Sequence, residues 1–308
     1  MTPRRSLPSK TPHETRSWVL PGDGRRPLRW GGRTLVMGIL NVTPDSFSDG
    51  GRYAGPEAAL ERALRMEAEG ADVIDVGGES TRPGSVAVSG AEEKKRVVPV
   101  VRLLAKRLKI PLSVDTSKAA VAEAAVDAGA RILNDIGALR LDSRMPGTAA
   151  RLKVPVVLMH LKGRPRTMQK NPKYYDVVAE ILAFFRERMA AIERSGVDPR
   201  NVVLDPGFGF GKTLEHNLEI TRRLGEFHVL GRPILFGPSR KSTLGILTGG
   251  APPGDRLEST LAAVTAGVLF GADAVRVHDV KETVRAVRIA DALLKADSRE
   301  PGTDRLKR

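Results

Sequence analysis

The stretch Met37-Gly-Ile-Leu-Asn-Val-Thr-Pro-Asp-Ser-Phe-Ser-Asp-Gly-Gly51 joins a buried-strand pattern to a long polar loop. The loop holds hydrogen-bonding side chains from Asn41 to Asp49, bends at Pro44 and ends at Gly50-Gly51. A plain connector needs about two to six residues, and this loop is about twice as long. Because α/β folds place their chemistry just past the carboxyl ends of strands, the stretch predicts an α/β fold with a functional loop here.

Short apolar runs of the strand type recur along the rest of the chain. They are Leu35–Leu40, Val73–Val76, Leu112–Val114, Ile132–Leu133, Val154–Met159, Val202–Leu204, Pro233–Phe236 and Ala274–Val277. Amphipathic helical patterns lie between them and after the last one, such as Leu257/Leu261/Val264/Val268 and Val280/Val284/Val287. Gly70, Gly129 and Gly271 stand where helices are expected to end.

Eight strand–helix units of this kind predict a (β/α)₈ TIM barrel with strands that are buried on both faces. The alternative is a doubly wound open sheet, but neither a P-loop nor a GxGxxG motif follows the first strand. We expect a basic, disordered leader over residues 1–25, the barrel over 26–296 and a charged tail over 297–308. Leu28 to Leu35 predicts a small hairpin that turns at Gly31-Gly32.

Composition limits the functional classes that remain. The chain has 308 residues, 41% of them hydrophobic, and no apolar run near the ~20 residues that a membrane span needs. The N-terminus lacks a secretory apolar segment. With no cysteine, the sequence excludes disulfides, thiolate metal sites and cysteine nucleophiles, and we expect a cytoplasmic protein.

The formal charge of +14 raises the possibility of nucleic-acid binding. However, residues 1–33 hold eight bases against two acids and residues 295–308 hold five against three, so eight of the fourteen charges lie in the terminal segments. Aromatic residues make up only 4%, so few side chains could stack on the bases of a nucleic acid. Solvated tails are favoured over a nucleic-acid arm, and a transit peptide over residues 1–17 is the other alternative.

Polar side chains follow every predicted strand at the same end. The segments are Asn41, Asp75–Gly84, Asp115–Lys118, Asn134–Asp135, Met159–His160, Asp205–Lys212, Gly237–Ser242 and Arg276–Asp279. In a barrel this end holds the active site, while the opposite end contributes to stability. Single positions have structural alternatives: Asp115 or Asp205 could cap a helix, and Asn134-Asp135 could be a turn.

Three of these side chains suit a flat heterocycle. Asp115, Asn134 and Asp205 follow different strands and can converge on one ring. A carboxylate accepts two parallel N–H donors, and an asparagine can donate and accept. An amidine-like edge would match this set.

A cationic set stands opposite: Arg240, Lys241, Arg276 and His278. Together with backbone N–H groups, it suits an anionic leaving group such as a diphosphate. The sequence shows no Ser-His-Asp or HExxH arrangement and no clear pair of catalytic carboxylates.

These motifs resemble those of the dihydropteroate synthase family, in family order over residues 28–295. The matching segments are Met37–Gly51, Asp75–Gly84, Asp115–Lys118, Asn134–Ile136, Met159–His160 with Thr167–Gln169, Leu204–Lys212, Ser239–Ser242 and Arg276–Asp279. The resemblance implies that 4-aminobenzoate condenses with 6-hydroxymethyl-7,8-dihydropterin diphosphate to give dihydropteroate and pyrophosphate. It also implies Mg²⁺ as cofactor, a homodimer that forms through outer helices, and sulfonamide drugs as inhibitors.

The resemblance also implies roles for individual residues. The pterin pocket would be lined by Asp115, Asn134, Met159, Asp205 and Lys241. The diphosphate and its Mg²⁺ would be bound by Thr81, Arg276, His278 and, as metal ligand, Asn41. Aminobenzoate would lie near Phe47, Arg82, Pro83, Lys241 and Ser242. Residues 43–51 would form a lid, and the residues nearest the chemistry would be Asn41, Asp115, Lys241, Arg276 and His278.

Two rival functions remain. A pterin-binding methyltransferase barrel uses similar Asp and Asn residues but needs no diphosphate site, so the motifs Ser239–Ser242 and Arg276–His278 disfavour it. A non-catalytic paralogue would show degraded loops, whereas both glycine-rich loops are complete. The resemblance has two departures, a basic segment at 161–166 and Pro238 before the Ser-Arg-Lys-Ser run.

Overall fold

The computed structural model describes residues 16–18, 28–43, 55–80, 88–163 and 167–297. Four of the predicted site residues lie outside these ranges: Phe47, Thr81, Arg82 and Pro83. The same holds for residues 44–51 of the predicted lid and for most of the predicted leader and tail.

Eight parallel strands form the centre of the molecule. They are β3 (Leu35–Asn41), β4 (Val73–Gly77), β5 (Leu112–Asp115), β6 (Ile132–Asp135), β7 (Val156–Met159), β8 (Val202–Asp205), β9 (Leu235–Phe236) and β10 (Ala274–Val277). Their order in the sheet is β8-β7-β6-β5-β4-β3-β10-β9. A parallel bridge between Leu204 and Ile234 joins the two edges, so the sheet closes into a barrel and the predicted fold is confirmed.

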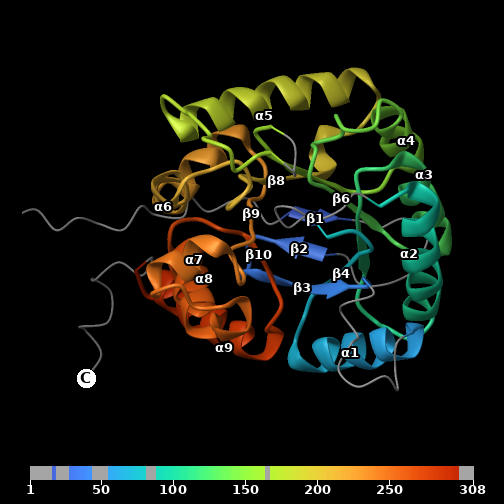
Figure 1. The fold of residues 1–308 in the computed structure, drawn as a ribbon, viewed down its shortest axis with the longest axis horizontal. Coiled ribbons are helices and arrows are strands. Elements are labelled where there is room, and N and C mark those ends of the chain that lie inside the picture. The colour runs from blue at the N-terminus through green and yellow to red at the C-terminus, as the bar shows by residue number, and fades with distance from the viewer. Residues whose placement is uncertain (1–15, 19–27, 44–54, 81–87, 164–166, 298–308) are drawn as a thin grey trace, which may run out of the picture.

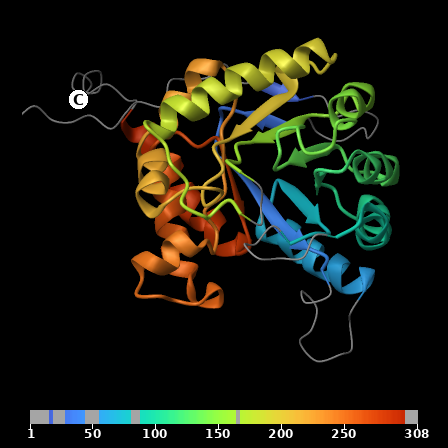
Figure 2. The same ribbon diagram turned by 45° about the horizontal axis from the view of Figure 1, so that its top comes forward.

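Helices surround the barrel, as Figures 1 and 2 show. They are α1 (Pro56–Glu69), α2 (Gly90–Ala105), α3 (Ala119–Ala128), α4 (Met145–Leu152), α5 (Val177–Arg194), α6 (Leu214–Arg222), α7 (Ser242–Leu247), α8 (Leu257–Leu269) and α9 (Val280–Asp297). Local sequence sets their ends. Asp176 accepts the N–H groups of Val178 and Ala179 at the start of α5, and Gly70 ends α1 with φ +103°. Within the described residues, no helix is long and apolar enough to cross a membrane.

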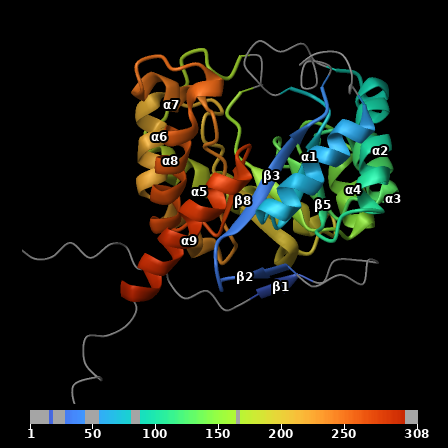
Figure 3. The same cartoon turned by 90° about the horizontal axis from the view of Figure 1, so that it is seen from below.

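A two-stranded antiparallel sheet lies at the amino-terminal end of the barrel (Figure 3). It pairs β2 (Leu28–Trp30) with β1 (Arg16–Trp18), so the predicted hairpin around Gly31-Gly32 is wrong. Leu35 instead enters the barrel, where its N–H donates to the carbonyl of Asp273 at 3.0 Å. Strand β1 falls within the leader expected over residues 1–25, so residues 16–18 of that segment pair with the barrel domain.

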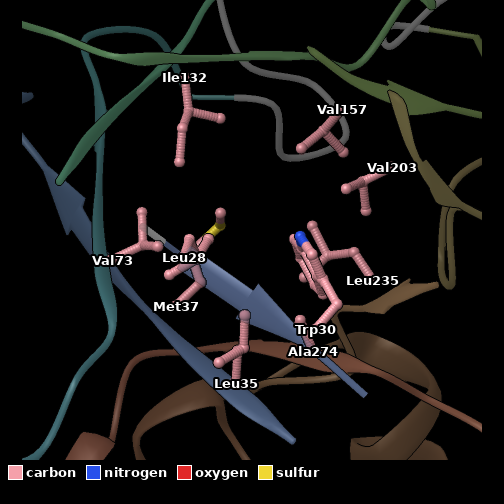
Figure 4. Close-up of a pocket in the computed structure, with 10 residues that line it drawn as sticks. All are labelled: Leu28, Trp30, Leu35, Met37, Val73, Ile132, Val157, Val203, Leu235 and Ala274. Carbon is pink, nitrogen blue, oxygen red and sulfur yellow. The ribbon is translucent and has the colours of Figure 1, made fainter. Parts of the chain in front are cut away.

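The floor of the barrel is apolar, and β2 covers it. Leu28 and Trp30 are 8% and 5% exposed and pack against the lowest inward side chains of the barrel strands (Figure 4). These floor residues are Leu35, Met37, Val73, Ile132, Val157, Val203, Leu235 and Ala274. Burial of this apolar ring favours placing β2 across the floor rather than in a local hairpin.

Candidate active site

A polar layer lies directly above the apolar floor. The floor residues Val73, Ile132, Val203 and Ala274 are followed two positions later by Asp75, Asn134, Asp205 and Arg276. Because alternate side chains of a strand face the same side, these polar residues also point into the barrel, one layer nearer its carboxyl end. The strand period therefore builds the site.

Arg276 connects two carboxylates across this layer. Its Nε donates to Oδ2 of Asp75 at 2.7 Å, and its Nη2 donates to Oδ2 of Asp115 at 2.7 Å. Burial disfavours the charged guanidinium, but the two carboxylates outweigh it and raise the pKa of Arg276. The side chain is 18% exposed, so it reaches solvent at the carboxyl end of the barrel, which we call the mouth, while the two carboxylates hold its guanidinium in place.

Asp75 holds a second site residue besides Arg276. The Nδ2 of Asn134 donates to Oδ2 of Asp75 at 2.9 Å, which fixes the amide and leaves its Oδ1 to accept from a ligand. Asp75 is fully buried, and its Oδ1 has no hydrogen-bond partner among the described residues. Sequence analysis quoted Asp75 in a motif but gave it no role. The signal that could have identified it is its position two residues after the floor residue Val73.

Asp115 is a site carboxylate and not a helix cap. Helix α3 begins at Ala119 with Lys118 in the capping position. Burial raises the pKa of Asp115 to about 7, although the charge of Arg276 opposes this shift. The carboxylate faces the mouth with its side chain 13% exposed.

Asp205 likewise caps no α-helix. Its Oδ1 accepts the backbone N–H of Gly207 at 2.7 Å, and Thr213 provides the cap of α6. Burial raises the pKa of Asp205, while that hydrogen bond and nearby cations lower it. The turn alternative holds only for Asp135, whose carboxylate accepts the N–H groups of Gly137 and Leu139.

Lys241 brings a cation to the same layer. Its Nζ lies 3.8 Å from the centre of the Phe210 ring, and its aliphatic stem passes over Gly209. A Cβ at Gly209 would lie 3.2 Å from Cδ of Lys241, so a side chain there would displace the lysine. Burial lowers the pKa of Lys241 to about 7, and repulsion from Arg276 adds to the shift.

An apolar wall borders this cation on one side. It consists of Ile136, Met159, Leu161, Met168 and Phe210. Each is less than one tenth exposed, so the wall is well packed before any ligand binds. The predicted packing residue Met159 thus belongs to a surface that suits the face of a flat ring.

The polar residues that follow β9 and β10 have different partners. Ser239 Oγ lies 2.9 Å from Nδ1 of His278 and accepts the backbone N–H of His278 at 3.2 Å, which favours a ring proton on Nε2. Ser242 is exposed at the first position of α7. Arg240 does not join them, because it forms an ion pair with Asp279. The expectation that Arg240 belongs to the leaving-group set is not supported.

Asn41 ends β3 next to Gly77, its partner on β4. A Cβ at Gly77 would lie 3.8 Å from Oδ1 of Asn41 and 3.6 Å from Oδ2 of Asp115. Among the described residues, no three His, Cys, Asp or Glu side chains gather to hold a metal ion. One amide oxygen still fits Mg²⁺, which prefers hard oxygen ligands and takes most of them from water and substrate phosphates.

Comparisons with known proteins agree with this geometry. A family model described as "Pterin binding enzyme" matches residues 37–278. The dihydropteroate synthase of Escherichia coli is 49% identical over 261 residues, which are 85% of this chain and 92% of that protein.

Solved structures show the same similarity. Dihydropteroate synthase of Yersinia pestis with a sulfonamide drug complex has a TM-score of 0.85 and 45% identity, over 91% of this chain and 100% of that one. The enzyme of Xanthomonas albilineans with 4-aminobenzoic acid has a TM-score of 0.84 and 46% identity, over 90% and 98%.

Proposed function

Because this chain belongs to the pterin-binding enzyme family, as a dihydropteroate synthase, we propose that its polar barrel mouth carries out the reaction of that enzyme. The protein is a transferase of folate biosynthesis. It condenses 6-hydroxymethyl-7,8-dihydropterin diphosphate with 4-aminobenzoate and releases pyrophosphate. The observation that carries the assignment is the polar layer of Asp75, Asp115, Asn134, Asp205 and Arg276 beside an apolar wall.

The pterin ring would bind in this layer. Its amidine-like edge presents N–H donors, which the carboxylates of Asp115 and Asp205 and Oδ1 of Asn134 can accept. One ring face would pack on Met159 and Phe210, with the ammonium of Lys241 at the ring edge. Burial makes these hydrogen bonds selective, because a ring without the donors would leave the carboxylates unpaired.

The diphosphate would extend toward Asn41, Arg276 and His278. Nε and Nη2 of Arg276 donate to Asp75 and Asp115, so its Nη1 would donate to a phosphate oxygen. Nε2 of His278 would donate to another phosphate oxygen. These groups stabilise the charge that grows on pyrophosphate as its bond to the methylene carbon breaks. Asn41 would hold Mg²⁺, which supplies further charge neutralisation when bound.

The second substrate needs little activation. The amine of 4-aminobenzoate is weakly basic and uncharged at pH 7, so no general base is required for its attack. The electron-rich pterin can share the positive charge on the methylene, which favours a dissociative path. Phe47, Arg82 and Pro83, assigned to this substrate by resemblance, lie outside the described residues, while Lys241 and Ser242 lie at the mouth.

Neither rival function is favoured. A methyltransferase barrel would have no use for the pair formed by Ser239 and His278 at the mouth. A non-catalytic paralogue would not be expected to keep Asp75, Asp115, Asn134 and Arg276 in one hydrogen-bonded layer.

We also propose a homodimer and a cytoplasmic location. Large apolar side chains are exposed on α7 and α9, on the side of the barrel where α8 lies between them (Figure 1). They are Ile246, Leu247, Ile289 and Leu293. A second copy that covers this face would remove them from water, so sedimentation analysis should give twice the mass of the chain. The absence of cysteine supports the cytoplasm.

One assay tests the proposed reaction. Purified protein is incubated with the pterin diphosphate, labelled 4-aminobenzoate and Mg²⁺, and the products are separated. We expect labelled dihydropteroate and one pyrophosphate per product. Folded protein that makes no product would contradict the assignment. A chelator should stop the reaction and added Mg²⁺ should restore it, which tests the metal separately.

A further inference from the structure

The loops that follow β7 and β8 approach each other unusually closely. A Cβ at Gly207 would lie 2.0 Å from the carbonyl oxygen of His160, and one at Gly211 would lie 2.4 Å from that of Lys162. Both glycines have positive φ, +71° and +64°. Only glycine fits these positions, so the two loops are locked together backbone to backbone.

Side chains add two further ties between these loops. Nε2 of Gln169 donates to the carbonyl of Gly209 at 2.6 Å, and the hydroxyl of Tyr174 donates to that of Gly211 at 2.9 Å. The locked pair carries Met159 on one side and Phe210 on the other, which are both members of the apolar wall. A shift of either loop would therefore change the surface that faces the pterin ring.

Lys212 lies at the centre of this junction. It is 3% exposed, and its Nζ donates to the carbonyl of Phe210 at 2.9 Å. The same nitrogen lies 3.0 Å from Nδ1 and 3.4 Å from the carbonyl oxygen of His160. An ammonium has three donors and no acceptor, so each of its protons has a partner here.

A lysine is a costly choice for this position. Among the described residues, no carboxylate forms an ion pair with its Nζ, and burial lowers the pKa of Lys212 to about 7, although the charge of Asp205 opposes this shift. A methionine of similar length would fill the space without that cost. What the lysine adds here beyond packing is therefore its hydrogen bonds to Phe210 and His160.

We propose that Lys212 is a positioning residue for the pterin half of the site. By holding the Phe210 carbonyl and His160 together, it fixes the Phe210 ring on which Lys241 rests, 3.8 Å away, and the neighbouring Met159. Because Lys212 is itself buried, it acts through these side chains and does not touch the substrate. This proposal rests on the proposed function, because it takes the pterin as the ligand of the apolar wall.

The test compares Lys212→Met with Lys162→Met in the full-length protein. Lys162 is a matched control from the same junction, since its ammonium lies over the Tyr174 ring at 3.9 Å and pairs with Glu180 instead. Lys212→Met should raise the KM for the pterin diphosphate about tenfold, with a smaller fall in kcat and a smaller rise in the KM for aminobenzoate. Lys162→Met should leave both KM values within about twofold.

Direct binding separates this proposal from the proposed function. Titration calorimetry with the pterin diphosphate measures affinity for each variant even if the wild type forms no product. An unchanged pterin affinity in folded Lys212→Met overturns the positioning role. Equal losses for both substrates, together with a lower Tm, would show a merely structural lysine and also overturn it.

A second variant covers the case in which Lys212→Met does not fold. His160→Phe keeps the edge contact with Phe184, whose ring centre lies 4.8 Å from that of His160, but removes the Nδ1 partner of Lys212. Its pterin affinity should fall about threefold while aminobenzoate binding is kept. An unchanged pterin affinity in folded His160→Phe contradicts the proposal. Where Lys212→Met also folds, the losses of the two variants should be less than additive in a double-mutant cycle, and full additivity contradicts the proposal as well.

Discussion

Arg276 on β10 donates from Nη2 to Oδ2 of Asp115 on β5 at 2.7 Å, although 161 residues separate the two along the chain. Strands β3 and β4 lie between them in the barrel. Resemblance alone assigns Arg276 to the diphosphate and Asp115 to the pterin. The contact makes the two assignments interdependent, because the guanidinium proposed to stabilise the leaving group also orients the Asp115 carboxylate proposed to bind the pterin.

Asn41→Ala should separate turnover from pterin binding. If Asn41 is the metal ligand, as proposed, its loss leaves less charge neutralised on the leaving pyrophosphate, so kcat should fall about 100-fold. Affinity for 6-hydroxymethyl-7,8-dihydropterin, which lacks the diphosphate, should stay within about twofold by calorimetry. Equal losses in both quantities would contradict the leaving-group role of Asn41.

Arg276→Ala should behave differently from Asn41→Ala. It leaves Asp75 and Asp115 without their cation, so both kcat and the affinity for the ring without diphosphate should fall. A lower affinity of about tenfold corresponds to the loss of one charged hydrogen bond. A variant that loses turnover alone would show that Arg276 serves only the diphosphate.

Asp75→Ala should destabilise the barrel. Asp75 is fully buried, and its removal leaves Nε of Arg276 and Nδ2 of Asn134 without their acceptor, at a cost of about 3 kcal/mol in the free energy of unfolding. The measurement is urea denaturation. As a control, Arg200→Ala breaks an ion pair with Asp198 from a side chain that is 83% exposed, and should cost below about 1 kcal/mol. Similar costs for the two variants would be incompatible with a buried hub.

Pterin affinity should be highest near pH 7. The pKa of Asp115 is raised to about 7, so its carboxylate form is lost as the pH falls below that value. The pKa of Lys241 is lowered to about 7, so its ammonium form is lost as the pH rises above it. Asp205 and Lys212 also titrate with shifted pKa values, so Asp115→Asn should shift the acid limb and Lys241→Met the alkaline limb of the profile without removing either, as measured by calorimetry from pH 5 to 9. A flat wild-type profile would contradict this assignment.

Trp30→Ala should lower stability without lowering activity. Trp30 covers the floor, at the opposite end of the barrel from the site (Figures 3 and 4), and its truncation exposes the apolar ring. A cost of about 3 kcal/mol is expected in urea denaturation, with kcat of the folded enzyme unchanged. Tyr175→Ala, at a fully exposed position, should change stability by less than about 0.5 kcal/mol. A large loss of kcat in folded Trp30→Ala would show that the floor and the site are coupled.

The sequence predicted the barrel and the end of it at which the polar side chains gather. Strand patterns, helix patterns and stop glycines are local signals, and all eight predicted strands appear as β3 to β10. The same two-residue period that places Val73 and Ile132 in the floor places Asp75 and Asn134 in the site. Convergence of Asp115, Asn134 and Asp205 follows from the closed parallel order of their strands.

Only the tertiary structure decided which charges pair. Arg240 and Arg276 are equally plausible anion ligands in the sequence, yet Arg240 pairs with Asp279 while Arg276 holds Asp75 and Asp115. The pairing of β1 with β2 across the floor was equally invisible to the local hairpin signal. The physical reason is that periodicity and turn chemistry act over a few neighbouring residues. Ion pairs and floor packing instead depend on strand order and on burial, which arise only when the barrel closes.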